Sequence, residues 1–345
     1  MNTSGFWDKL HKPIFVLAPM ADVTDASFRY IIAKYSKYAG KDIGAYGEKN
    51  IPHAENEYPH VLWTEFVSAD GLVLAPEEGK KKLMRDLMFT PAERPIVAQF
   101  FTSKPENMRK AAVIAKELGF DGVDINMGCP DKGIEKQGAG AAMIKTPKLA
   151  REIIRAAKEG GQDLPVSVKT RIGYNRDQLE EWLPELLAEE PALITIHART
   201  RKEMSKVPAR WEHVKRAVEI RNELKSRTLI FGNGDALSID DARKKVTETG
   251  CDGVMLGRAI FGNPWVFRDP VYTPSIKEKL EVLIEHTKLY EKLLGDIKSF
   301  SIMKKHFKAY VDGFDGAKKL RVELMDTQSA LEVELKIREF LESCS

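Results

Sequence analysis

The sequence is poor in cysteine and has no long apolar run. Three cysteines, Cys129, Cys251 and Cys344, stand among 345 residues, and their spacing matches neither a metal-ligand pair nor a disulfide framework. So low and odd a count is typical of a reducing compartment, so we expect a cytoplasmic protein without a bound metal. No apolar stretch approaches the ~20 residues of a membrane span. The opening MNTSGFWDKL lacks the basic segment and apolar run of a secretion signal, so we expect no signal peptide. We also expect no membrane partner.

Net charge is also low. The formal value is +3, which permits a nucleic-acid partner without requiring one. Apolar residues make up 43% and charged residues 30%, the balance of an ordinary soluble globular protein. The length suits one large domain, or one barrel with a small appendage.

Eight short apolar runs, rich in β-branched residues, alternate with longer amphipathic segments. They lie at 14–20, 61–67, 95–101, 122–128, 165–171, 193–199, 228–234 and 253–258. Continuous apolar runs are typical of strands covered on both faces. Eight strand–helix units within about 250 residues fit a closed barrel better than an open sheet. The sequence therefore predicts an α/β fold, a (β/α)8 TIM barrel, with an open doubly wound sheet as the alternative.

Helices are expected between these strands. The segments are 24–38, 104–119, 147–161, 176–190, 213–226 and 238–250. Thr24 is the candidate N-cap of the first segment. Gly119 ends the second, as glycine often does at helix C-termini, and Pro147 opens the third, where proline is favoured.

The pattern changes after Trp265. The stretch PVYTPS, 270–275, has the composition of a linker, and from Ile276 onward only helical periodicity remains. We expect three or four helices there. The predicted organisation is a catalytic barrel over 1–270 followed by an all-helical C-terminal domain over 271–345.

The segment 39–63 is long for the connection ahead of the second strand. Loops of this length tend to be functional or to carry short elements of their own. Both interpretations stay open.

Polar residues and Gly/Pro corners stand at the C-terminal ends of the expected strands, where barrel enzymes carry their working residues. In strand order they are Pro19, Met20 and Ala21; Glu65; Gln99; Asn126 to Pro130; Lys169 and Arg171; His197 and Arg199; Gly232 to Asp235; Gly257 and Arg258. One such lysine or histidine is more often structural than catalytic. Corners of this kind at every strand end favour a functional rim.

The last two corners, GNGDALS and GRAIFGNP, favour a phosphate site. Barrel enzymes often bind phosphate with the loops after strands seven and eight, and glycine N–H groups can close on an anion. Two ordinary strand-to-helix turns are the alternative. A redox ring needs a cation and amide groups at its edge, which Lys169, His197 and Gln99 could supply. No GxGxxG follows a strand, so FMN fits better than a dinucleotide.

Cys129 stands in DINMGCPDKG, 124–133, at a corner between Gly128 and Pro130. Free cysteine is usually a small buried hydrophobe. Reduction of a pyrimidine C=C bond, however, takes a hydride on one carbon and a proton on the next. A thiol can supply that proton, because its reference pKa of ~8.5 keeps it protonated near neutral pH. At this corner we favour the reactive role.

Several segments resemble the tRNA-dihydrouridine synthase family and occur in the family's order. They are APMADVTDASFR, NMGCP with the following GAGAAMIKTP, SVKTRIG, ITIHARTR, GNGD and DGVMLGRAIFGNPW. The later MKKHFKAYVDGFDGAKKLR is similar to the family's helical domain. The resemblance implies an FMN enzyme that reduces particular uridines of tRNA to 5,6-dihydrouridine, with NADPH as the electron source.

The resemblance also implies residue roles. The positions that match flavin contacts are Pro19, Met20, Ala21, Gln99, Lys169, His197, Asn233, Gly234, Asp235, Gly257 and Arg258. Cys129 matches the donor of the proton to C5, with the hydride going to C6. Asn126 and Arg171 match positions that face the target uracil.

Two stretches depart from the family. The segment 39–63 is longer than expected. After His197 the chain reads ARTRKEMSKVPARW, where the family often has a glycine and later a tyrosine–glycine pair. We expect the substrate loop to differ, and not the flavin site.

Basic residues cluster in helical segments. The clusters are Lys80, Lys81, Lys82 and Arg85; Lys304, Lys305, His306 and Lys308; and Lys318, Lys319 and Arg321. A basic helical face can hold phosphates without reading sequence, or be an ordinary solvated face. For tRNA as the partner, the target base must also leave its stack to reach a rim pocket.

Two other functions stay open. One is an FMN barrel dehydrogenase acting on a free pyrimidine, of the dihydroorotate or dihydropyrimidine type. The other is a catalytically silent tRNA-binding protein. The basic helical segments argue against the first, and Cys129, Lys169 and His197 argue against the second. A monomer is expected.

Overall fold

The computed structural model describes residues 5–41, 43–44, 46–47 and 60–343. Packing divides the chain into two compact units. The first comprises Met1–Met20, Glu57–Leu87 and Arg94–Gly257, and the second comprises Ala21–Asn56, Met88–Glu93 and Arg258–Ser345. The predicted boundary at residue 270 stays a prediction.

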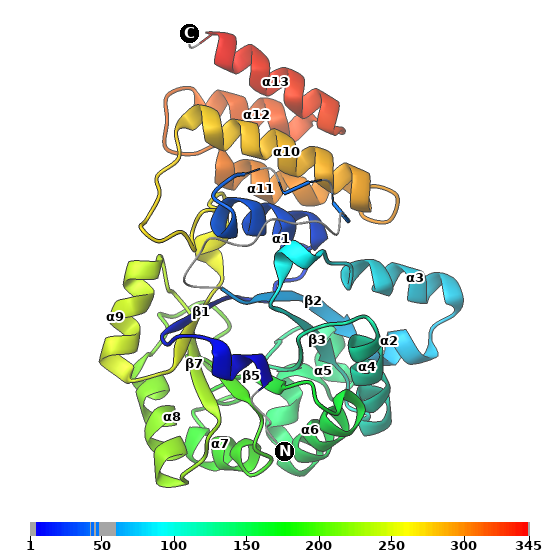
Figure 1. Ribbon diagram of the computed structural model, residues 1–345, viewed down its shortest axis with the longest axis vertical. Coiled ribbons are helices and arrows are strands. Elements are labelled where there is room, and N and C mark those ends of the chain that lie inside the picture. Colours follow the sequence, from blue (N-terminus) through cyan, green and yellow to red (C-terminus); the bar gives the residue numbers. More distant parts are fainter. Residues whose placement is uncertain (1–4, 42, 45, 48–59, 344–345) are drawn as a thin grey trace. The chain divides into compact units, whose positions relative to one another are not determined.

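The first unit is built on a sheet of eight parallel strands within the described residues (Figure 1). They are β1 (Ile14–Leu17), β2 (Leu62–Ser68), β3 (Ile96–Phe101), β4 (Gly122–Met127), β5 (Val166–Arg171), β6 (Leu193–His197), β7 (Leu229–Asn233) and β8 (Gly253–Leu256). Their order is β1-β8-β7-β6-β5-β4-β3-β2. A parallel bridge from Val16 to Val61 joins the two ends of that order, and Leu17 N donates to Val61 O at 2.9 Å. The predicted closed barrel is confirmed.

Helices surround these strands (Figure 1). They are α2 (Ala69–Leu74), α3 (Glu77–Asp86), α4 (Pro105–Glu117), α5 (Lys132–Lys136), α6 (Pro147–Gly161), α7 (Leu179–Leu187), α8 (Glu212–Glu223) and α9 (Ile239–Thr249), with the short 3-10 helices η1 (Gly5–Lys9) and η4 (Gly140–Lys145). Pro147 opens α6 as predicted. Gly119 follows α4 with φ 79°, the left-handed conformation that favours glycine.

One end of the barrel is filled by apolar side chains. Trp7, from η1, packs against Trp63 and Phe231 with ring centroids 5.9 and 5.7 Å apart. The same buried cluster includes Ile14 and Leu193, which lie at the starts of their strands. The N-terminal end of the barrel is therefore closed by a core, which leaves the C-terminal strand ends for a site.

The second unit is helical within the described residues. It contains α1 (Ala26–Ile32), η2 (Ala33–Lys37), η3 (Pro91–Glu93), η5 (Arg258–Ile260), α10 (Ile276–Leu294), η6 (Phe300–Ile302), α11 (Met303–Tyr310), α12 (Ala317–Asp326) and α13 (Ala330–Ser343). The four α-helices from α10 onward confirm the expected C-terminal helices, and α10 begins at Ile276 as predicted (Figure 1). None of the helices described in either unit is long and apolar enough to cross a membrane.

The second unit corrects one prediction from the sequence and bears on another. The N-cap of α1 is Asp25, not Thr24, because the Asp25 carboxylate accepts from Phe28 N at 3.0 Å. A buried ion pair of Arg29 and Glu93, with Nε and Oε2 2.8 Å apart, ties α1 to η3. Of the segment 39–63, residues 42, 45 and 48–59 lie outside the described residues.

Candidate active site

The strand register aligns predicted site residues on neighbouring strands of the first unit. Asn126 is paired with Lys169, Arg171 with His197, and His197 with Asn233. The first unit holds Pro19, Met20, Gln99, Asn126, Cys129, Lys169, Arg171, His197, Asn233, Gly234, Asp235 and Gly257. Ala21 and Arg258 are grouped with the second unit, and each is exposed.

Cys129 lies on a turn whose backbone is held on both sides. The Asn126 Oδ1 accepts from Gly128 N at 3.1 Å and from Cys129 N at 2.9 Å. The Cys129 carbonyl in turn accepts from Ala141 N at 2.9 Å. A short side chain that accepts from backbone N–H groups two and three residues on is the usual way to fix such a turn. The position of the thiol is therefore set by the fold.

Gly140 is required where the chain passes this turn. Its φ is 61°, and a Cβ there would lie 2.8 Å from the carbonyl oxygen of Cys129. That separation is too short for real atoms, and the contact is with backbone, which cannot swing away. No other residue type can fill the position without moving Cys129.

Burial raises the pKa of the Cys129 thiol above its ordinary value. The positive charges of Arg171 and Lys169 act in the opposite direction. The thiol is thus protonated at neutral pH, the form that a proton donor needs, and its side chain is only partly buried. Cys251 is buried two residues before β8, and its Sγ donates to Gly253 O at 3.2 Å, which marks it as a core residue. Cys344 lies outside the described residues.

A polar network lies beneath the turn, inside the barrel. Asp124 is fully buried; its Oδ2 accepts from Gln99 Nε2 and its Oδ1 from Ser167 Oγ, both at 2.5 Å. The Asn126 Nδ2 donates to Gln99 Oε1 at 3.1 Å. Gln99 therefore links the buried carboxylate to the residue that fixes the Cys129 turn.

Lys169 places a cation in the barrel mouth. Part of its side chain is accessible, but burial of the ammonium, helped by the nearby charge of Arg171, lowers its pKa to about 8. Asp124 and Cys129 act in the opposite direction. The ammonium is mostly charged at neutral pH and so suits an electron-rich or anionic group.

Arg171 ties two loops together. Its Nε donates to Gly128 O at 2.7 Å, and its Nη1 donates to Thr200 O at 3.1 Å and Met204 O at 3.0 Å. Both residues expected to face the uracil, Asn126 and Arg171, thus also brace the Cys129 turn. Their contact with substrate stays a prediction.

His197 and Asp235 are joined by Arg199. The Arg199 Nη1 lies 3.1 Å from His197 Nε2, and its Nη2 donates to Asp235. Because a guanidinium can only donate, His197 Nε2 accepts, and in the neutral ring the proton is on Nδ1. Arg199 therefore sets the tautomer of His197.

The ends of β7 and β8 are tightly packed turns. Asn233 Nδ2 donates to Met255 O at 2.8 Å, and Gly234 has φ 121°. A Cβ on Gly257 would lie 3.7 Å from the Cβ of Ala18 and 3.8 Å from the Sδ of Met20, so these residues form one wall of the mouth.

The loop where the sequence departs from the family is held by charged contacts. Arg201 pairs with Glu135 of α5 and lies 5.1 Å from the ring of Tyr174. Lys145 lies 4.4 Å from the same ring, and Arg210 pairs with Glu203 at 2.8 Å. The loop is thereby attached to the segment that follows Cys129.

The sequence interpretation gave no role to Asp124 or Arg199. A signal was present for Asp124, which shares the period-two alternation of Gly122 and Asn126 on one strand face. A carboxylate in a strand that is otherwise apolar or amide-bearing indicates a buried partner. The sequence places Arg199 on the rim with His197, but no pattern in the sequence indicates that it joins His197 to Asp235.

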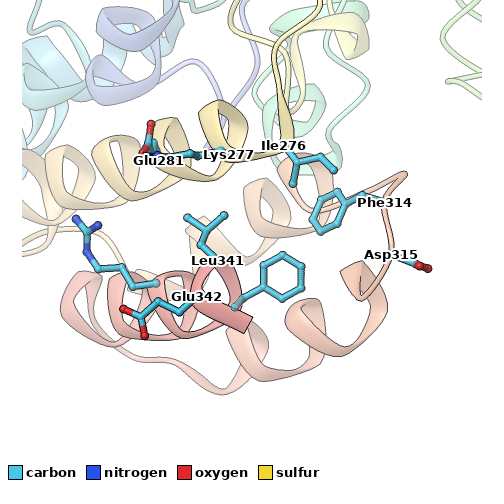
Figure 2. Close-up of a pocket in the computed structure, with 9 residues that line it drawn as sticks. Ile276, Lys277, Glu281, Phe314, Asp315, Leu341 and Glu342 are labelled. Carbon is cyan, nitrogen blue, oxygen red and sulfur yellow. Dashed lines mark ion pairs between the residues drawn. The ribbon is translucent and has the colours of Figure 1, made fainter. Parts of the chain in front are cut away.

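A hollow lies in the helical unit, away from these residues in the chain (Figure 2). Its volume is about 560 Å³, and it is lined by Ile276, Lys277, Glu281, Phe314, Asp315, Arg338, Phe340, Leu341 and Glu342. None of the predicted site residues lines it. Among the described residues, no group of three or more His, Cys, Asp or Glu side chains could hold a metal ion.

The fold and the rim define a class of protein, a (β/α)8-barrel enzyme with a protonated thiol near a partly buried cation. The chain belongs to the dihydrouridine synthase (Dus) family, whose model matches residues 16–344. Family membership confirms the expected class of enzyme, a dihydrouridine synthase.

Known proteins resemble the chain along almost its whole length. It is 39% identical over 340 residues to a probable tRNA-dihydrouridine synthase 2 of Bacillus subtilis (strain 168), covering 98% of this chain and 97% of that protein. It is 38% identical over 338 residues to a probable tRNA-dihydrouridine synthase of Staphylococcus aureus (strain MRSA252), covering 97% and 95%. The 6-hydroxypseudooxynicotine amine oxidase of Pseudomonas geniculata N1 shares only the fold, at 14% identity and a TM-score of 0.51, covering 83% of this chain and 53% of that one.

Proposed function

We propose that this chain is a tRNA-dihydrouridine synthase that reduces the C5=C6 bond of uridines in tRNA, with FMN as cofactor and NADPH as reductant. The observation that carries the proposal is the Cys129 turn. The backbone of the turn is held by Asn126. The Cys129 thiol stays protonated at neutral pH and lies close enough to Lys169 and Arg171 to sense their charges. The named relatives at 38–39% identity support tRNA as the substrate.

The residues of the mouth fit a flavin. Lys169 is a desolvated cation, and Thr195 Oγ1 is buried without a hydrogen-bond partner among the described residues. Buried polar groups of this kind normally have partners, so a ligand with polar edges suits the site. The residues that would hold FMN are Pro19, Met20, Ala21, Gln99, Lys169, His197, Asn233, Gly234, Asp235, Gly257 and Arg258. When bound, FMN supplies the hydride equivalent for reduction of the uracil ring at C6.

Cys129 would hold and deliver the proton. Its Sγ carries a proton at neutral pH, and transfer to C5 leaves a thiolate. Arg171 and Lys169 lower the cost of that thiolate, because both charges favour the ionised form. The thiolate then takes a proton from solvent. Asn126 and Arg171 would orient the uracil while they hold the turn.

The helical residues 271–345 would bind tRNA through basic side chains. Lys305, Lys308, Lys318 and Lys319 are exposed. His306 is fully buried, so it cannot belong to the basic face on which the sequence placed it. We propose a monomer that acts in the cytoplasm.

The test is a Cys129→Ala variant. Its flavin absorbance should match that of the wild type, because no flavin contact is assigned to the thiol. Its dihydrouridine formation on tRNA that lacks the modification should fall by roughly 10²-fold or more, the range typical of a lost proton donor. Mass spectrometry of tRNA digests measures the product.

Cys251→Ala is the matched control, since it removes a thiol from the core and should leave turnover near the wild-type value. Wild-type turnover by Cys129→Ala would disprove the proton-donor role. Purified protein without flavin that cannot be reconstituted with FMN would disprove the enzyme proposal itself.

A further inference from the structure

Asp124 is a charged side chain inside the barrel with no part in the proposed chemistry. It is fully buried on β4, and burial raises its pKa to about 6. Its charged form is therefore disfavoured at neutral pH relative to an exposed carboxylate. An apolar residue would fill a barrel interior without that cost, so the hydrogen bonds of Asp124 need an explanation.

Those bonds fix the direction of two amides. A side-chain amide has a donor end and an acceptor end, whereas an ionised carboxylate only accepts. Asp124 therefore turns the Nε2 of Gln99 toward itself, at 2.5 Å, and the Oε1 of Gln99 toward Asn126. Asn126 gives its Nδ2 to Gln99, at 3.1 Å, and so keeps its Oδ1 for the turn.

The chain of bonds ends at the backbone of Cys129. The Oδ1 of Asn126 accepts from Gly128 N and Cys129 N. If both amides were reversed, Asn126 would present its amino group to those two N–H donors, and both bonds would be lost. The orientation of Gln99 thus decides whether the turn is held.

We propose that Asp124 is a positioning residue for Cys129, which acts through the Gln99 and Asn126 amides to hold the turn that carries the thiol. This proposal rests on the proposed function only for the role of Cys129 as proton donor. The hydrogen bonds from Asp124 to the Cys129 turn can be tested without turnover, so either proposal can fail without the other.

The test measures alkylation of Cys129 by iodoacetamide in the full-length protein as purified, with no tRNA or reductant. Variants are compared at equal flavin content, and mass spectrometry reads the Cys129 and Cys251 peptides separately. Asp124→Leu removes the acceptor, so local opening of the turn should raise the Cys129 rate by about tenfold. The rate of the buried Cys251 should not change, which shows that the barrel is still folded.

Gln99→Met breaks the same series of hydrogen bonds at its next member and should raise the Cys129 alkylation rate by the same factor. The double variant should be no faster than either single variant, because both changes break one pathway. Asp124→Asn can still accept from Gln99, so it should label at a rate within about threefold of the wild type. Ser167→Ala is the matched control, because it removes a different hydrogen-bond partner of Asp124 and leaves the hydrogen bonds from Asp124 through Gln99 and Asn126 to Cys129 intact.

The dependence on pH separates position from charge. The Cys129 alkylation rate is therefore measured from about pH 7 to pH 10. A turn that has opened raises the limiting rate at high pH, whereas loss of a nearby negative charge shifts the pH at which the rate is half its limit. A wild-type rate in folded Asp124→Leu or in Gln99→Met would overturn the proposal. So would an equal increase in Ser167→Ala. If Asp124→Leu does not fold, Gln99→Met and its double variant with Asp124→Asn decide the question.

Discussion

At the scale of single residues, the Cys129 turn depends on a glycine that has no space for a side chain. Gly140 combines a φ of 61° with a backbone oxygen 2.8 Å from the position of a Cβ. Gly313 has a similar φ of 81° but nothing within 4 Å. The two glycines therefore separate backbone strain from steric conflict.

Gly140→Ala should cost more free energy of unfolding than Gly313→Ala. The shared strain of a left-handed alanine is about 1 kcal/mol. Displacement of the Cys129 carbonyl should add roughly 1–3 kcal/mol to the first variant only, and should also lower its turnover. Urea denaturation of both variants measures the difference. Equal losses would show that the turn moves aside without cost.

The sequence could predict the site residues that lie at strand ends, but not those that act through distant partners. Cys129, Lys169 and His197 lie at or within two residues of the C-terminal ends of their strands, and a barrel brings these ends together whatever the side chains are. Asp124 and Arg199 act through partners that are distant in the chain, such as Gln99 on β3 and Asp235 after β7, and a single sequence contains no record of those pairings. The rim could be predicted, but its internal bonding could not.

At the scale of elements, α11 has one basic face and one buried face. Lys305 and Lys308 are exposed and Lys304 is half-buried, whereas His306 and Phe307 are buried. The exposed lysines are available for phosphate groups. If this face docks tRNA, neutralised phosphates release counterions and binding becomes salt-dependent.

Lys304→Glu combined with Lys305→Glu should therefore weaken tRNA binding and reduce its salt dependence by about one to two units of slope. Filter binding at several salt concentrations measures both. The control combines Lys277→Glu with Lys336→Glu, which makes the same change in net charge on α10 and α13. Equal weakening by the two double variants would mean that overall charge, and not the α11 face, attracts tRNA.

The eight strands could be predicted because parallel strands, buried on both faces, leave continuous apolar runs in the sequence. The sequence marks α3 only by the basic cluster from Lys80 to Arg85, which is expected to be helical, because no residue of α3 is buried and no apolar period marks it. The short helix α5 could not be predicted. The α5 helix has five residues, and the Asp131 carboxylate caps it by accepting from Gly133 N and Ile134 N.

At the scale of the whole molecule, the packing of the second unit joins parts that are far apart in the chain. Phe28 of α1 stacks on His286 of α10 and meets His306 of α11 edge-on, with centroids 4.8 Å away in both cases. The histidine rings are 4.7 Å apart, and neither has a hydrogen-bond partner among the described residues. Sequence periodicity assigned the three helices but not this contact, because nothing local indicates it.

This histidine pair makes the second unit sensitive to acid. Burial lowers the pKa of His286 to about 3, and burial together with His286 and Lys305 lowers the pKa of His306, against the opposing effect of Asp25. The unfolded chain takes up protons near pH 6.5, which the folded state cannot do until much lower pH. Stability is therefore full above pH 6.5 and is lost as the pH falls toward 3.

For His286 alone, the loss at pH 5 is about 2 kcal/mol. Hydrogen exchange at pH 7 and pH 5, corrected for intrinsic rates, should show loss of protection in α10 and α11. His286→Phe keeps an aromatic ring against Phe28 and removes the titration, so its stability should depend less on pH. His213→Gln, in α8 of the barrel, is the control and should leave the pH dependence of α10 and α11 unchanged. If His286→Phe retained the full wild-type loss, carboxylates elsewhere would be its source, since their protonation is the other common cause of acid unfolding.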